Sequence, residues 1–255
     1  MYNDLFTVFG LTVHGYGLMI GLGVVASLMI SWRRARKKGV SEDTVSTMTI
    51  LAVVIGFLGG KVFYLLTHWS YFMADPLGSL GSEGFVVYGG ILFGFAACWL
   101  YARRKGDRFL PWSDLLLPGV AVAQGFGRVG CFLAGCCYGA PTDSCIGVTF
   151  PAGSFAPAGV PLWPTQLISA AGDLLLALIL LRMDRKKTYD GRITVWYLIL
   201  YTVGRFLVEF LRADNRGSVG ALSASQFIGL FVIAAALALR AFLKRGQNGE
   251  KQDKN

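Results

Sequence analysis

The chain has 255 residues, of which 54% are hydrophobic and only 15% are charged, and its mean hydropathy is +0.54. A soluble domain carries roughly a quarter charged residues, so this composition excludes an ordinary soluble fold and indicates an integral membrane protein. The net charge of +9 does not indicate a nucleic-acid-binding protein. Its basic residues gather at the ends of apolar segments, where retention beside the anionic cytoplasmic leaflet accounts for them.

Seven apolar segments each approach the roughly 20 residues that a membrane-spanning helix needs. The N-terminal stretch has no basic region and no small-residue cleavage site before its apolar part, so we expect it to be retained as the first span. The predicted spans cover approximately residues 13–32, 45–67, 85–102, 112–134, 164–181, 193–210 and 223–243. The sequence therefore predicts an all-α integral membrane protein with one transmembrane domain, 1–243, and a polar, disordered cytoplasmic tail, 244–255.

The connectors between these spans alternate in charge. Lys and Arg cluster in 33–38, 102–108, 182–187 and the start of the tail, whereas 68–84, 135–163 and 211–222 carry only Arg212 and Arg216. Because basic connectors stay in the cytoplasm, the N-terminus is predicted outside and the C-terminus inside. The connector 135–163 has four prolines and no Lys or Arg, so we expect it to form a small extracytoplasmic head, and long loops of this kind often carry function.

Arg128 lies in the outer half of the fourth predicted span. An arginine at such a depth costs roughly 3 kcal/mol, so its position needs an explanation. One explanation is a structural ion pair with Glu209 or Asp173. The other is an anion site, since the forked guanidinium group suits phosphate oxygens.

The sixth predicted span contains a second charged group. Tyr201, Arg205, Glu209 and Arg212 are spaced four, four and three residues apart, so they line one helical face. Glu209 can pair with Arg205 and orient it. A helix stabilised by its own ion pairs is one explanation, but such pairs are worth only tenths of a kcal/mol in water. Two buried arginines with one carboxylate leave a surplus of positive charge, which favours an anionic partner such as a lipid phosphate.

Other polar residues in the spans have simpler explanations. Tyr16 and Tyr88 lie near the outer surface, where tyrosines commonly act as interfacial anchors. Lys61 is interpreted as an interfacial lysine or a partner for a headgroup. Asp114 and Asp173 are predicted to stabilise the cytoplasmic side or a contact between helices.

The five cysteines occupy positions 98, 131, 136, 137 and 145. They include no C-x-x-C pair and both histidines lie far from them in the sequence, so neither a metal site nor a cofactor is predicted. A disulfide from Cys136 or Cys137 to Cys145 is possible in an oxidising exterior, and the sequence leaves that pairing open.

Several short motifs follow one another in a fixed order along almost the whole chain. They lie at 16–19, 88–90, 127–132, 135–142, 164–167 and 201–212. Together they resemble the bacterial prolipoprotein diacylglyceryl transferase family, and the block G-R-x-G-C-F followed by C-C-Y-G-x-P-T is highly specific. The resemblance implies an inner-membrane enzyme with seven helices and a small periplasmic head.

The resemblance also implies a reaction and its residues. Diacylglyceryl moves from phosphatidylglycerol to the lipobox cysteine thiol in a prolipoprotein signal peptide, which forms a thioether and releases glycerol phosphate. Arg128 matches the arginine that holds the headgroup, and Arg205 matches a second essential arginine. The remaining implied positions are Tyr201 and Tyr88 among the catalytic residues, and Tyr16, Gly89, Gly90, Cys131, Gly139, Glu209 and Arg212 in substrate binding.

Two departures from the family pattern affect the expected mechanism. Family members have His where Tyr88 stands and Asn where Cys131 stands, so a histidine base does not carry over to this chain. We expect Tyr88 to position a headgroup oxygen while the arginines lower the pKa of the substrate thiol, and the proton acceptor stays open. The alternative function is an anion channel or transporter with the arginines as a selectivity ring. The missing internal repeat counts against this alternative.

Overall fold

The computed structural model describes residues 4–8, 11–81, 84–185, 189–213, 218–220 and 222–252. Arg216, Lys186 and Lys187, which belong to the connectors considered above, lie outside these residues. The chain divides into two compact units. One comprises residues 1–31 and 113–255, and the other comprises residues 32–112.

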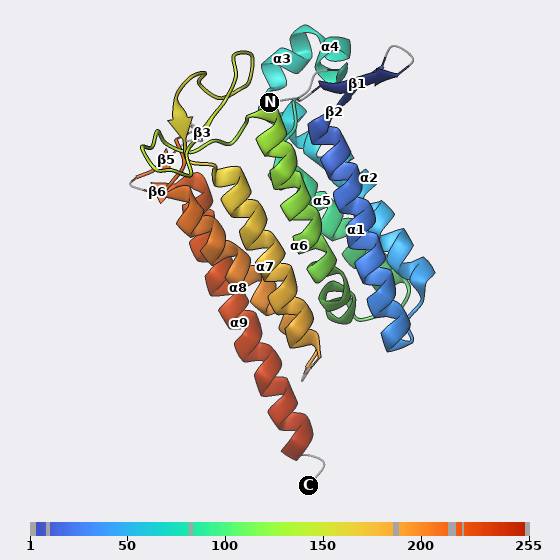
Figure 1. The fold of residues 1–255 in the computed structure, drawn as a ribbon. Helices are drawn as coiled ribbons and strands as arrows, with labels where there is room; N and C mark the ends of the chain where they lie inside the picture. Colours follow the sequence, from blue (N-terminus) through green and yellow to red (C-terminus); the bar gives the residue numbers. More distant parts are fainter. Residues whose placement is uncertain are drawn as a thin grey trace. The chain divides into compact units, whose positions relative to one another are not determined.

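Within the described residues, seven long helices correspond to the seven predicted spans (Figure 1). They are α1 (Gly15–Lys38), α2 (Glu42–Thr67), α5 (Val87–Arg104), α6 (Phe109–Ala134), α7 (Thr165–Asp184), α8 (Arg192–Glu209) and α9 (Ala224–Gln252). Five of them, α1, α2, α6, α7 and α9, are long and apolar enough to cross a membrane. The other two, α5 and α8, have 18 residues each and end in or contain charged residues. The helical fold class is therefore confirmed, with five clear candidate spans.

Several short elements were not predicted. An antiparallel hairpin of β1 (Asp4–Val8) and β2 (Leu11–His14) precedes α1. The short helices α3 (Trp69–Ala74) and α4 (Pro76–Gly81) follow α2. The hairpin of β5 (Ser218–Val219) and β6 (Leu222–Ser223) precedes α9.

The prediction of a disordered tail is wrong for residues 244–252, because α9 continues to Gln252. This stretch is polar but contains Lys, Arg, Glu and Gln, all of which favour the helical backbone. Polarity alone therefore did not mark the end of the helix. The last three residues of the tail lie outside the described part of the chain.

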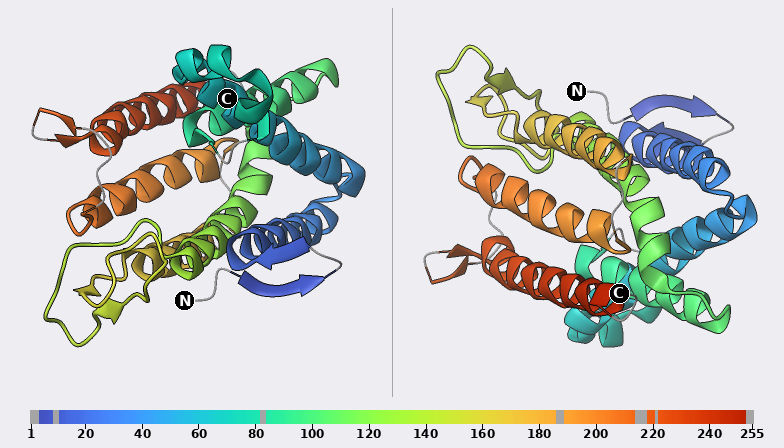
Figure 2. Two further views of the ribbon diagram at one scale, coloured as in Figure 1. Left: turned by 90° about the horizontal axis from the view of Figure 1, so that it is seen from above. Right: turned by 90° about the horizontal axis from the view of Figure 1, so that it is seen from below.

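In the unit of residues 1–31 and 113–255, α8 packs against both α7 and α9, and Figure 2 shows it between them. A core of apolar side chains joins α6, α7 and α8: Ala121, Leu176, Ala177, Leu180, Ile193 and Tyr197. The N-terminal part of α1 packs closely on α6. A Cβ atom at Gly119 would lie only 2.7 Å from the backbone oxygen of Ser27, so this approach requires glycine.

The start of α8 is held by the fully buried Asp114 of α6. Its Oδ2 atom accepts a hydrogen bond from the Gly191 N–H, at 2.8 Å. Its Oδ1 atom accepts from both the N–H and the hydroxyl of Thr194, each at 2.8 Å. A carboxylate at this place satisfies N–H groups that have no partner within the helix and complements the helix dipole. The prediction that Asp114 makes a contact between helices is confirmed.

In the unit of residues 32–112, α2 and α5 pack along each other through glycines. Gly56 faces Gly90 and Gly59 faces Gly89, a register that makes the two helices antiparallel. A Cβ atom at Gly89 would lie 2.4 Å from the Cβ of Phe63. Small residues let apolar helices approach closely, so the structure gives both Gly89 and Gly90 a packing role.

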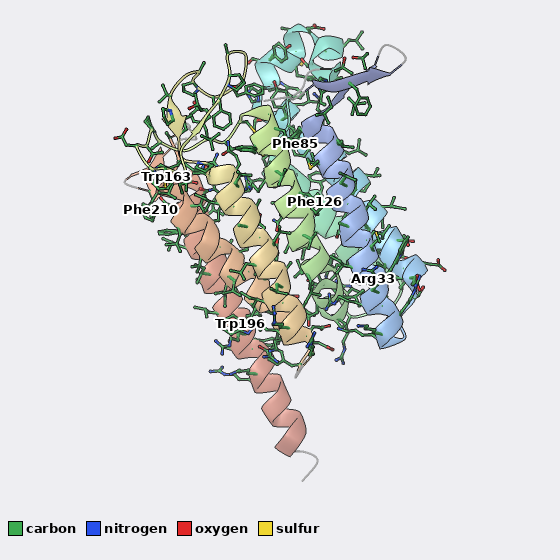
Figure 3. The ribbon with its side chains drawn as sticks, in the orientation of Figure 1. Arg33, Phe85, Phe126, Trp163, Trp196 and Phe210 are labelled. Carbon is green, nitrogen blue, oxygen red and sulfur yellow. The ribbon has the colours of Figure 1, made fainter. Side chains whose placement is uncertain are left out.

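The connector 135–163 forms a head with a small core of its own. Its strands β3 (Val148–Thr149) and β4 (Pro161–Leu162) pair in antiparallel fashion. Phe150, Ala156 and Leu162 are buried together, with Phe132 of α6 packed against them. The head meets the end of α8 near Trp163 and Phe210, whereas Trp196 lies toward the other end of that helix (Figure 3).

Candidate active site

A cavity of about 80 Å³ lies among α6, α7 and α8. Its polar lining consists of Arg128 from α6, Asp173 from α7, and Tyr201 and Arg205 from α8. Small and apolar side chains complete the wall: Ile168, Ser169, Gly172, Leu176, Leu200, Gly204 and Val208. Two arginines from separate helices thus line the same cavity.

On α8, Glu209 is positioned between two cations. The Arg205 Nη2 atom lies 2.6 Å from Glu209 Oε2, and the Arg212 Nε atom lies 3.9 Å from the same oxygen. The side chains of Glu209 and Arg212 are only 8% and 4% exposed, so these charges interact away from bulk water. Arg205 also donates a hydrogen bond to Ser225 Oγ at 3.5 Å. The predicted pairing of Glu209 with Arg205 is confirmed, and it leaves one net positive charge in this group.

Asp173 of α7 is a further member of the site, and it was considered above as an ion-pair partner of Arg128. It is 7% exposed, lines the cavity and interacts electrostatically with both Arg128 and Arg205. Its place among residues of α6, α7 and α8 agrees with the predicted contact between helices and not with the alternative on the cytoplasmic side. Asp173 lies eight residues from Thr165, the start of α7, or about 12 Å along the axis. Counting depth from the head end of each helix would have placed it near the arginines.

Tyr201 is held in place by a neighbouring ring. Tyr197 stacks on it with ring centroids 5.6 Å apart and ring planes 3° from parallel. The Tyr197 hydroxyl donates a hydrogen bond of 2.8 Å to Gln124 Oε1 of α6. This chain of contacts links Tyr201 of α8 to α6, at the wall of the cavity.

Tyr16 and Gly139 have local explanations in the structure. A Cβ atom at Gly130 would lie 3.1 Å from Tyr16 Cδ2, so the Tyr16 ring packs on α6 between Arg128 and the head. Gly139 lies between Trp163 and Leu211, where a Cβ atom would come within 2.7 Å of both. Packing accounts for this glycine, and its role in substrate binding stays a prediction.

Tyr88 belongs to the unit of residues 32–112, where its side chain is 50% exposed. It stands at the start of α5, next to the two glycines that pack on α2. Lys61, in the same unit, places its ammonium group 5.3 Å from the centre of the Tyr64 ring. The expected roles of Tyr88 and of Lys61 at a headgroup stay predictions.

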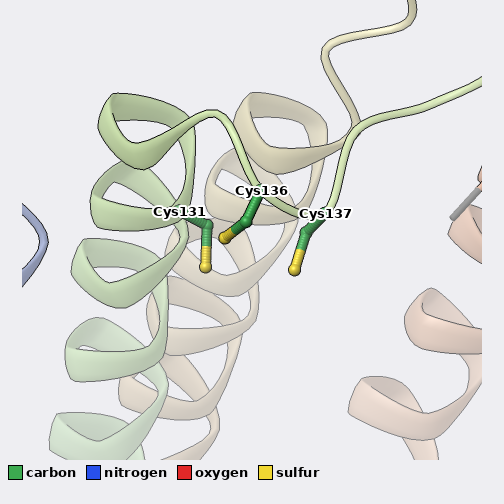
Figure 4. Close-up of side chains that lie close together, drawn as sticks. All are labelled: Cys131, Cys136 and Cys137. Atoms are coloured by element: carbon green, nitrogen blue, oxygen red, sulfur yellow. The ribbon is translucent and has the colours of Figure 1, made fainter. Parts of the chain in front are cut away.

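Three cysteines converge beside this site. The Sγ atoms of Cys131, Cys136 and Cys137 all lie within 4.8 Å of one another (Figure 4). None of these three thiols, nor that of the exposed Cys145 in the head, is joined in a disulfide. Hydrogen bonding with the Cys131 and Cys137 thiols, together with burial, raises the pKa of the Cys136 thiol. Sequence spacing alone did not indicate this cluster.

Comparison with known proteins agrees with the motifs. The family model of the prolipoprotein diacylglyceryl transferases matches residues 3–242. A phosphatidylglycerol–prolipoprotein diacylglyceryl transferase 2 of Clostridium perfringens is 46% identical over 250 residues, covering 96% of this chain and 97% of the relative. The corresponding enzyme of Clostridium tetani is 48% identical over 231 residues, covering 90% and 92%. That of Dehalococcoides mccartyi is 34% identical over 253 residues, covering 98% and 96%. The chain therefore belongs to the prolipoprotein diacylglyceryl transferase family.

Proposed function

We propose that this protein transfers the diacylglyceryl group of phosphatidylglycerol to the lipobox cysteine thiol of prolipoproteins. The observation that carries the proposal is the meeting of Arg128 and Arg205 at one cavity in a chain of this family. A cavity of about 80 Å³ suits a phosphate group and is too small for two acyl chains. The lipid tails would therefore stay among other lipids while the headgroup enters between the helices. The family match supports this function over an anion channel.

In the proposed reaction, the thiol sulfur attacks the lipid carbon that bears the phosphate ester. A carbon–sulfur bond forms, the carbon–oxygen bond breaks, and glycerol phosphate leaves with the bonding electrons and takes up the proton that the thiol loses. Negative charge grows on the phosphate oxygens, where two preorganised guanidinium groups stabilise the transition state. Glu209 holds Arg205 in place for this role, and Asp173 orients both arginines. Tyr201, one turn before Arg205 on α8, positions the headgroup at the wall of the cavity.

The proposed topology has seven spans in the bacterial inner membrane, with the head of residues 135–163 on the periplasmic side. Each 18-residue helix extends about 27 Å, which approaches the 30 Å thickness of the hydrocarbon core. The antiparallel packing of α5 on α2 supports a span for α5. The alternating basic connectors support an external N-terminus and a cytoplasmic C-terminus.

The test is an assay of diacylglyceryl transfer from phosphatidylglycerol to a lipobox peptide. We expect Arg128→Ala and Arg205→Ala each to lower turnover by about 10²–10³-fold, as the loss of one charge-stabilising donor does elsewhere. Lysine at either position should also fail, because it lacks the forked geometry. Arg240→Ala is the matched control. The Arg240 guanidinium lies 5.3 Å from the Trp196 ring centre, away from the cavity.

Normal turnover by Arg128→Ala would contradict the assignment of the cavity as the headgroup site. An Arg240→Ala variant as impaired as the cavity variants would show that the losses reflect general damage to the fold. Anion flux into protein-containing vesicles without any lipid turnover would support the channel instead.

A further inference from the structure

A helix cap brings the first two thiols of the cysteine cluster together. Gly135 follows α6 with a positive φ of 74°. Its N–H donates to the Phe132 carbonyl, and the Cys136 N–H donates to the Cys131 carbonyl, each at 3.1 Å. This pair of bonds is the Schellman motif. In it, the side chains of the two residues five positions apart, here Cys131 and Cys136, commonly touch. Here both of those side chains carry a thiol.

The third thiol is presented by a residue in an unfavourable conformation. Cys137 has a φ of 62°, which costs a residue with a Cβ atom about 1–2 kcal/mol. Two buried side chains at the start of α7 hold this turn. Thr165 donates to the Cys137 carbonyl at 2.8 Å, and Gln166 donates to the Cys136 carbonyl at 2.7 Å. The convergence of the three sulfur atoms is thus built into the backbone.

The spacing of the sulfur atoms fits a coordinated metal ion. Zinc–sulfur bonds are about 2.3 Å long, so three sulfur atoms around one ion lie about 4 Å apart. The three Sγ atoms lie within 4.8 Å of one another, so small rotations suffice. A disulfide would engage only two of the three. The complex of a divalent ion with three thiolates has a net charge of −1. Arg128, three residues before Cys131, interacts electrostatically with Cys131 and Cys137 and can balance this charge.

We propose that Cys131, Cys136 and Cys137 form a three-thiolate site for a soft divalent cation of the zinc and cadmium class. The proposal departs from the expectation drawn from sequence spacing, since the cap joins residues five and six positions apart. Three protein ligands leave the fourth position of a tetrahedral ion open to water or to another thiol. The bound ion would link the end of α6 to the start of the head, next to Arg128.

The test uses the full chain, reduced and freed of metal with a chelator, in detergent. Titration with cadmium should saturate at one ion per protein, followed by the ultraviolet sulfur-to-cadmium charge-transfer band. X-ray absorption of the loaded wild-type protein should count three sulfur neighbours. Cys136→Ser and Cys137→Ser should each weaken binding by at least about 10–100-fold, since even losing a residue that only orients a ligand costs that much. Cys98→Ser and Cys145→Ser are the matched controls and should bind as the wild type does.

Absence of saturable binding, or fewer than three sulfur neighbours in the wild-type protein, would overturn the proposal without relying on any variant. An equal loss of affinity in Cys145→Ser would also overturn it, because that thiol lies outside the cluster. If the reduced protein binds no cadmium and air oxidation joins two of the three thiols, the cluster is a redox pair and not a metal site.

Discussion

Replacing Asp114 should lower the stability of the protein, by releasing the start of α8, without removing any side chain that lines the cavity. The fully buried carboxylate accepts two backbone N–H groups, those of Gly191 and Thr194, and one hydroxyl. Asp114→Ala leaves the two N–H groups without this acceptor, and each buried group left unsatisfied costs about 1–3 kcal/mol. We therefore expect the free energy of unfolding to fall by about 2–6 kcal/mol. Asp114→Asn keeps one acceptor oxygen and should lose about half as much.

The measurement is the free energy of unfolding in mixed detergent micelles, with the transfer rate per folded molecule measured alongside it. Thr194→Ser is the matched control, because it preserves the hydroxyl, whose oxygen also lies 2.9 Å from Ser113 Oγ. In the Asp114 variants, the transfer rate per folded molecule should stay near that of the wild type. An Asp114→Ala protein within about 0.5 kcal/mol of wild-type stability, the range of an ordinary surface substitution, would show that Asp114 does not anchor α8.

Two further predictions follow from the packing. Gly89→Ala should destabilise the protein by about 1–3 kcal/mol, as overpacking does, because the new Cβ would lie 2.4 Å from another side chain. Gly21→Ala is the control and should leave stability unchanged, because nothing lies within 4 Å of its Cβ. Thermal unfolding of the two variants measures the difference. Tyr197→Phe should cost about 1 kcal/mol by removing the hydrogen bond to Gln124, and it should lower diacylglyceryl transfer by loosening Tyr201. Unchanged stability and transfer in this variant would show that the stacked pair does not position the cavity wall.

Hydropathy predicted the seven long helices because each apolar run is bounded by charged or turn-forming residues. The α2 boundaries differ from the predicted span by at most three residues. The same reasoning missed β3 and β4, since two-residue strands are too short to show an alternating pattern. The polar end of α9 was misjudged because composition does not separate a solvated helix from a disordered tail.

For the candidate site, helical spacing was enough to pair Glu209 with Arg205, because both lie on one helix. Asp173 could not be assigned in this way, since its approach to the arginines depends on how α7 packs beside α6 and α8. The cysteine cluster depends on a capping turn and on a left-handed Cys137. Neither leaves a periodic signal in the sequence.

The attachment of the head suggests where this protein can tolerate change in evolution. Both ends of the loop between residues 143 and 160 are fastened nearby, since Thr142 donates to the Pro161 carbonyl and Trp163 donates to that of Ala140. Ala140 in turn donates to the Leu211 carbonyl at the exit of α8. Insertions at exposed positions of that loop, away from β3 and the buried Phe150 and Ala156, would leave these anchors untouched. The loop is thus the natural place for lineages to diversify, or for an engineer to graft a foreign segment, without redesigning the arginine cavity.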